Sequence, residues 1–157
     1  MKVLLVILLL AGVGIAWASV GHVGYSFRGP GYDPNSGVTT KLEGPVIIAL
    51  TDGKIKRGSG AAFFKELRQV LDAIPESEGL IGYAVRKELL GNKVWTLSAW
   101  TSRDALKRFV SSESHRQAVK AGGISPATVH SVTLEMSPSE LPISWKRVEN
   151  ILEDAES

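Results

Sequence analysis

The stretch from Val94 to Val119 constrains the fold most, because it predicts an interior β-strand followed directly by a helix in two parts. Side chains alternate between the two sides of a strand. One side carries Val94, Thr96, Ser98 and Trp100, and the other carries Trp95, Leu97 and Ala99. Because both sides are largely apolar, the strand is expected to be covered on both faces. A fold for this chain must therefore supply a layer on each side of the strand.

Capping signals place the two parts of the helix. Thr101–Asp104 fits the capping-box pattern, in which a hydroxyl accepts a backbone N–H three residues on and a carboxylate reaches back. Apolar residues follow at helical spacing. A second cap, Ser114–Gln117, predicts that the helix breaks near Ser111–Ser114 and restarts, with His115 at a helix N-terminus.

The rest of residues 45–157 predicts a ferredoxin-like α+β domain. Ser59 can cap an amphipathic helix that Pro75 ends, and Gly91-Asn92 is a hairpin turn signal. The expected order is a strand at 45–50, a helix at 59–74, strands at 80–89 and 94–100, the two-part helix, a strand at 127–136 and a short C-terminal helix after Ser144. This βαββαβ order is the split βαβ arrangement.

Residues 1–24 are predicted to be a membrane anchor or a signal peptide. Met1 and Lys2 precede an uncharged run over residues 3–20, which would be roughly 27 Å long as a helix, close to the thickness of a bilayer core. Ala16-Trp17-Ala18 also fits a cleavage site. A retained hydrophobic helix would anchor the domain to a membrane, outside the cytoplasm, whereas cleavage would release a secreted protein.

Residues 25–44 are predicted to be a flexible linker. This segment is rich in Gly, Pro, Asn and Ser and shows no apolar period. If the anchor is retained, the linker would give the folded domain freedom above the membrane.

Charge and composition exclude several classes of function. The net charge of +2 and the absence of a long Lys/Arg run give no reason to expect a nucleic-acid partner. The chain has no cysteine, which excludes disulfides, thiolate metal sites and a cysteine nucleophile. Its 3 histidines show no i, i+4 pairing and no His–carboxylate cluster in the sequence, so no metal site is expected.

Three features carry a resemblance to a known family: the strand ending in Trp100, the capped helix that follows it, and Ser114-His115. Over residues 46–136 the chain resembles the antibiotic-biosynthesis-monooxygenase-type domains of the dimeric α+β barrel superfamily. The tail at residues 141–145 is similar to that of an uncharacterised branch. The resemblance implies two copies paired through the open face of the sheet, each enclosing a pocket. The apolar residues on both strand faces also favour a homodimer.

The resemblance is less specific for activity, because the superfamily includes cofactor-free monooxygenases, haem-degrading enzymes and isomerases. In the haem-degrading branch an Asn, a Trp and an iron-binding His correspond here to Ile48 or a neighbour, Phe109 and Val119. Valine cannot bind iron, so haem degradation would need His115 or His130 as a substitute ligand. No cofactor is expected.

His115 is the possible catalytic base. A helix N-terminus disfavours the imidazolium, which leaves a neutral ring that can accept a proton. The structural alternative is that His115 fills the helix break and hydrogen-bonds a backbone carbonyl.

Five further residues are expected to line a pocket, each with a structural alternative. The large aromatic side chains can stack on a planar ligand or belong to the core. A histidine on the last strand can line a pocket or be a satisfied core residue, and an arginine can balance an anionic ligand or pair with Glu113. These five residues are Trp100, Tyr83, Phe109, His130 and Arg116.

Two classes of function stay open. The first is a membrane-tethered monooxygenase-like domain that oxygenates a small aromatic or lipophilic compound without a cofactor: a base removes a proton and the resulting carbanion reduces oxygen. The second is a non-catalytic module at the membrane that binds a small ligand or a partner.

Overall fold

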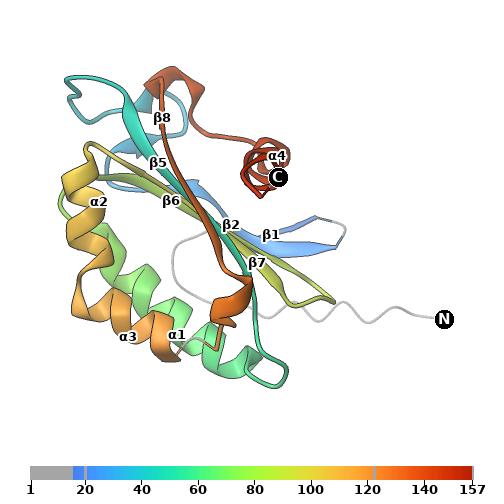
Figure 1. Ribbon diagram of the computed structural model, residues 1–157. Helices are drawn as coiled ribbons and strands as arrows, with labels where there is room; N and C mark the ends of the chain where they lie inside the picture. Colours follow the sequence, from blue (N-terminus) through green and yellow to red (C-terminus); the bar gives the residue numbers. More distant parts are fainter. Residues whose placement is uncertain (1–15, 20, 122, 157) are drawn as a thin grey trace.

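The computed structural model describes residues 16–19, 21–121 and 123–156, in which a six-stranded sheet is packed between two layers (Figure 1). The strands of the sheet are β1 (Ala16–Ser19), β2 (His22–Arg28), β5 (Val46–Lys54), β6 (Leu80–Glu88), β7 (Lys93–Trp100) and β8 (His130–Met136). The helices are α1 (Gly60–Ala73), α2 (Arg103–Val110), α3 (Glu113–Ala121) and α4 (Trp145–Asp154). A small separate hairpin pairs β3 (Tyr32–Asp33) with β4 (Gly37–Val38).

The strand order confirms the predicted ferredoxin-like fold. The sheet runs β1-β2-β6-β7-β5-β8, and all neighbouring strands are antiparallel. The β6-β7-β5-β8 part, with α1 between β5 and β6 and the α2–α3 pair between β7 and β8, is the βαββαβ arrangement. Strands β5 and β7 lie in the interior of the sheet, as their apolar sequences predict.

The prediction that β7 is covered on both faces is confirmed. On one face Val94 packs with Phe63 of α1, and Trp100 packs with Ala105 of α2. On the other face the alternate residues of β7 join a cluster with Val148 and Leu152 of α4. Figure 1 shows α1, α2 and α3 on one side of the sheet and α4 on the other.

The helix after β7 is in two parts, but both caps lie at other residues than predicted. The Ser102 hydroxyl, not that of Thr101, accepts the N–H of Ala105 at 3.1 Å. The Ser112 hydroxyl accepts the N–H of His115 at 3.2 Å, so His115 lies in the first turn of α3. Neighbouring hydroxyl residues are equally able to cap a helix, so the sequence locates the break but not the capping residue.

The expectation of a flexible linker over residues 25–44 does not match the structure. Strand β2 includes the first part of this segment and pairs with β6, and β3 and β4 follow. A Cβ at Gly29 would lie 2.4 Å from Gly82 Cα, and one at Gly31 would lie 3.0 Å from Ile81 Cα. These glycines therefore permit close approach to β6, which composition alone cannot distinguish from flexibility.

The predicted N-terminal hydrophobic helix over residues 3–20 falls largely outside the described residues. At its end, Ala16–Ser19 forms β1 and pairs with β2 instead of being helical. Within the described part of the chain, no helix is both long and apolar enough to cross a bilayer.

The sheet face opposite α1–α3 is covered within the single chain. Val148 and Leu152 of α4 are 0% and 2% exposed against this face. Phe27, Tyr32, Val38 and Leu42 pack against the same cluster from the N-terminal segment. Because this cover already buries the apolar residues, a second copy is not needed to bury them. The homodimer prediction then rests on the family resemblance alone. The sheet face through which two copies were expected to pair is covered by α4 and the N-terminal segment.

Replacing Leu152 by Ala tests this intramolecular cover. The change removes a fully buried side chain between α4 and the sheet, so we expect the free energy of unfolding to fall by about 2–5 kcal/mol. Leu90→Ala is the matched control, because Leu90 is 98% exposed, and its effect should stay within about 0.5 kcal/mol. Urea unfolding measures both changes. Equal, small effects in the two variants would contradict the packing of α4 on the sheet.

Candidate functional site

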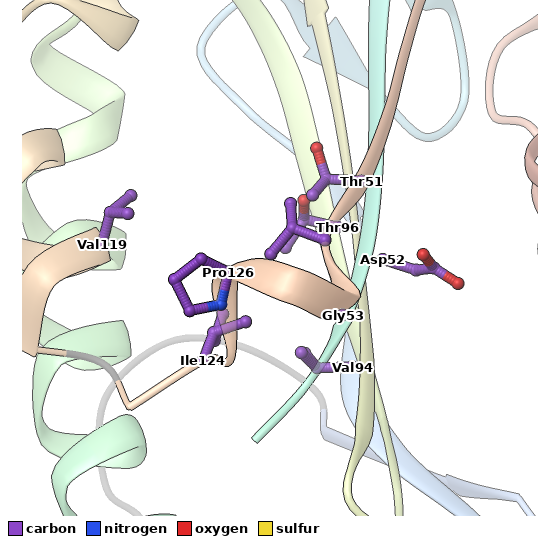
Figure 2. A pocket seen from close by; sticks show the side chains of 9 residues that line it. Thr51, Asp52, Gly53, Val94, Thr96, Val119, Ile124 and Pro126 are labelled. Atoms are coloured by element: carbon purple, nitrogen blue, oxygen red, sulfur yellow. The ribbon is translucent and has the colours of Figure 1, made fainter. Parts of the chain in front are cut away.

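An apolar cavity lies between the sheet, α3 and the connection that leads from α3 to β8 (Figure 2). Its volume is about 430 Å³. Strands β5 and β7 form one wall, and Val119 of α3 lies across the hollow from them. The lining residues are Thr51, Asp52, Gly53, Val94, Thr96, Val119, Ile124, Pro126 and Val129.

The hollow arises because the sheet presents small residues to the helices at this point. Thr51 and Thr96 are directly paired across β5 and β7, and Gly53 has no side chain. Farther along the same face, Trp100 and Tyr83 are large and pack against their neighbours in a closed core cluster. The change from large to small side chains leaves space beneath α3 that the described residues do not fill.

The cavity wall offers few polar groups. Asp52 borders it, but Figure 2 shows the Asp52 carboxylate pointing to the opposite side of the sheet from Val119 and Pro126. The Thr51 hydroxyl lies 3.0 Å from the Ser131 hydroxyl, with which it hydrogen-bonds. No ionisable side chain among the described lining residues points into the hollow. This lining therefore suits an uncharged ligand, since burying an unpaired charge is strongly unfavourable.

His115 occupies the helix break, as its structural alternative predicts. Its Nδ1 lies 3.1 Å from the carbonyl oxygen of Val110, and its ring contacts the ring of Phe109 edge-on at 4.8 Å between centroids. Because a carbonyl can only accept, Nδ1 carries the proton in this bond and Nε2 is left as the acceptor. His115 does not line the cavity. Its role as a base stays a prediction.

Burial lowers the pKa of His115 below its ordinary value, and the hydrogen bond to Val110 opposes this shift. This shift favours the neutral form of the ring. The cause is desolvation of a half-buried imidazole, whereas the sequence argument relied on the helix dipole.

Two of the three predicted aromatic pocket residues belong to the core, and the third, Phe109, is half-buried and packs against it. Trp100 is 0% exposed, and its Nε1 donates to the Ser98 hydroxyl at 2.9 Å. Its ring lies 5.0 Å from that of Phe109, and Tyr83 is buried in the same cluster. None of the three lines the cavity. The alternative that large aromatics fill the core matches this arrangement.

Arg116 and His130 lie apart from the cavity and from each other. Arg116 is exposed and pairs with Glu113 at 2.7 Å, which was its structural alternative. His130 lies on the opposite face of the sheet, where it contacts Asp52 and Glu156. The structure thus brings His115, Phe109 and Trp100 into one chain of contacts and leaves Arg116 and His130 outside it.

None of the residues that the sequence singled out for a pocket lines this cavity. Small residues at alternate positions of β5 and β7 could have indicated the cavity, because small side chains on a covered sheet face leave space beneath the covering helix. The contributions of Ile124 and Val129 depend on the path of a loop, which no local pattern specifies.

The pKa of His115 gives a test of its environment. We expect its imidazole to titrate below the value of about 6.5 that is typical of an unfolded chain. Between the pKa of His115 in the folded state and its higher pKa in the unfolded state, the unfolded state binds more protons. The free energy of unfolding therefore falls as the pH decreases through this range. Imidazole ¹H–¹⁵N NMR measures the midpoint, and His115→Gln should reduce this loss of stability in acid. A midpoint at or above the unfolded value would contradict the burial of the ring.

Comparisons with known proteins agree with this fold. Residues 46–121 match the family model described as antibiotic biosynthesis monooxygenase. A comparison with curated proteins finds no match. Among solved structures, a conserved protein from Methanosarcina mazei Go1 is similar with a TM-score of 0.54 and 15% identity, over 59% of this chain and 94% of that one.

Two further solved structures share the fold. Rv0793 from Mycobacterium tuberculosis has a TM-score of 0.51 and 14% identity, over 57% of this chain and 92% of that one. LmHde, a heme-degrading enzyme from Listeria monocytogenes, has a TM-score of 0.54 and 12% identity, over 72% of this chain and 69% of that one. At these identities the likeness concerns the fold alone. The family model that matches residues 46–121 shows that this part of the chain is a domain of the antibiotic biosynthesis monooxygenase family.

Proposed function

We propose that this domain binds a small, uncharged and largely apolar molecule in the cavity beneath α3. The observation that carries the proposal is the hollow of about 430 Å³ with its mainly apolar wall. Its size falls within the range of small-molecule sites, and apolar walls with few polar groups are typical of such sites. The pair of threonines on β5 and β7 supplies hydroxyl groups that can orient a ligand.

The wall of the cavity does not suit haem. Val119 lines the cavity and corresponds, by the family resemblance, to the iron-binding histidine of the haem-degrading branch. The described lining contains no imidazole or thiol that could bind iron. His115 faces the Val110 carbonyl, and His130 lies on the other face of the sheet. The activity in the name of LmHde is therefore not proposed for this chain.

Cofactor-free oxygenation is the second candidate, supported by the family match over residues 46–121. In that reaction a base removes the proton of a phenol or enol, and the resulting carbanion transfers electrons to oxygen. The lowered pKa of His115 favours a neutral ring, and the hydrogen bond from Nδ1 to the Val110 carbonyl leaves Nε2 to accept a proton, which suits a base. It lies outside the cavity lining, so it would require a substrate that extends toward the break between α2 and α3.

Two expectations about location and assembly belong to the same proposal. The uncharged run at residues 3–20, of which residues 16–19 form β1, supports a leader or anchor upstream of the domain, and so a membrane-anchored or secreted protein outside the cytoplasm. The family resemblance supports a homodimer. Because α4 and the segment 27–42 cover one sheet face, we propose that any pairing of two copies uses another surface. Membrane fractionation and sedimentation of the full chain test these two expectations.

A tryptophan at the cavity rim tests ligand binding. Val119 lines the cavity and is 60% exposed, so Val119→Trp can fill the hollow without disturbing the core. We expect it to weaken binding of the apolar probe N-phenyl-1-naphthylamine about tenfold or more, equivalent to at least about 1.4 kcal/mol. Probe fluorescence measures the affinity.

Val110→Trp is the matched control, because Val110 is an exposed helical valine, 47% exposed, that does not line the cavity. It should bind the probe as the unaltered protein does. Equal affinities in both variants, or no saturable binding at all, would contradict the proposed site.

Oxygen uptake separates catalysis from binding alone. If the domain is an oxygenase, a panel of hydroxylated aromatic compounds should include one that causes saturable oxygen consumption. Val119→Trp should abolish this consumption because it occupies the cavity. Leu90→Trp should retain it, because Leu90 is 98% exposed and lies neither in the cavity lining nor at the break between α2 and α3. His115→Gln should reduce turnover while leaving ligand affinity unchanged. Ligand binding without oxygen consumption would favour the non-catalytic module.

A further inference from the structure

We propose that Asp52, His130 and Glu156 form a binding site for a divalent transition-metal ion, such as Zn²⁺, on the sheet face opposite the apolar cavity. One ligand atom from each of the three residues lies within 4.8 Å of the other two. The residues come from β5, from the first position of β8 and from the segment that follows α4. Their wide separation along the chain explains why no ligand spacing is visible in the sequence.

The carboxylates of Asp52 and Glu156 both contact one ring nitrogen of His130. Asp52 and His130 are direct partners across β5 and β8, and His130 Nδ1 lies 2.9 Å from Asp52 Oδ1. The same Nδ1 also contacts Glu156 Oε1. A ring nitrogen carries at most one proton, so a single N–H cannot make two linear hydrogen bonds to these carboxylates. A divalent cation can bind the nitrogen and both oxygens together.

Asp52 gives the cluster a fixed, buried member. Its side chain is 2% exposed, and a carboxylate at that depth requires a compensating charge. Lys93 supplies this charge, with its Nζ 2.5 Å from Asp52 Oδ2. Oδ1 is thus the oxygen that faces His130. In a metal-bound form Lys93 would hold Oδ2 and orient the ligand, which is a common role for a residue behind a metal ligand.

The surroundings are accessible and negatively charged. A crevice next to the cluster is lined by Asp52, Lys93, Trp95, Glu149, Leu152, Glu153 and Glu156. This lining includes four carboxylates and the Lys93 ammonium group, and Arg86 pairs with Glu149 from outside it. The carboxylates still outnumber the cationic groups, so the crevice attracts cations. Glu156 and His130 are partly exposed, which gives an ion a path from solvent.

The donor set favours a transition metal over Mg²⁺ or Ca²⁺. Imidazole nitrogen suits Zn²⁺ and its neighbours, whereas Mg²⁺ and Ca²⁺ prefer oxygen ligands alone. Three protein ligands leave a coordination position for water. Because two ligands belong to the sheet and the third follows α4, a bound ion would fasten the end of α4 to the sheet. The ion would therefore stabilise the layer that covers this face.

Zn²⁺ titration of the full chain, without an affinity tag and after treatment with a chelator, tests the proposal. Isothermal titration calorimetry should show saturable binding of one ion per chain. Because each removes one ligand, His130→Asn and Glu156→Gln should each weaken this binding about tenfold or more. Co²⁺ should produce visible absorption bands in the unaltered protein that both variants lose.

Glu153→Gln is the matched control for Glu156→Gln. It makes the same change of charge in the same crevice but lies outside the three-residue group, so its Zn²⁺ affinity should match that of the unaltered protein. Zn²⁺ should also raise the thermal unfolding midpoint of the unaltered protein and of this control only. Equal weakening by Glu153→Gln and Glu156→Gln would show a diffuse attraction of cations and overturn the site. Unchanged affinity in His130→Asn, or no saturable binding, would overturn it as well.

Discussion

The fold depends on one constraint: the interior strands β5 and β7 are apolar on both faces, so each face of the sheet needs its own layer. Helices α1, α2 and α3 supply the first layer. Helix α4, together with the segment 27–42, supplies the second. Each fully buried aliphatic side chain contributes about 1.5–3 kcal/mol when removed from water, so neither layer is dispensable.

The two layers give the two faces different properties. Beneath α3 the sheet presents Thr51, Gly53 and Thr96, and the missing bulk leaves the apolar cavity. Between Thr51 and Gly53, the side chain of Asp52 points to the opposite face and meets His130 and Lys93. The period of two along a strand thus places an apolar cavity and a polar cluster at consecutive residues of β5. The ligand proposal and the metal proposal therefore concern separate faces and can fail separately.

Residues 46–136 were predictable because their patterns are local. Alternation in β7, the hairpin turn at Gly91-Asn92 and the break between the two short helices each depend on a few neighbouring residues, and the order of elements follows from them. The N-terminal strands were not predictable in this way. Glycines allow the N-terminal segment to lie close against β6, but a segment rich in glycine has the composition of a flexible linker. Pairing with a strand that is distant in the sequence also gives the segment no periodic pattern of apolar residues.

The sites were less predictable than the fold. His115 was singled out for its position at a helix start, and its contact with the Val110 carbonyl matches the structural alternative. The partners of His130 lie 78 positions before it and near the end of the chain, so sequence spacing could not indicate them. Cavities are similarly set by which side chains from distant elements fail to meet, and a single sequence does not specify this.

The proposed ligand site is the hollow under α3 and not the sheet face beneath α4. Methyl NMR of the protein with N-phenyl-1-naphthylamine tests it most directly, because intermolecular NOEs locate the probe among named side chains. Binding in the hollow should give NOEs to the methyl groups of Val94, Val119 and Ile124, which line the cavity. NOEs to Val132 and Leu152 on the α4 side, without any to the cavity residues, would contradict it.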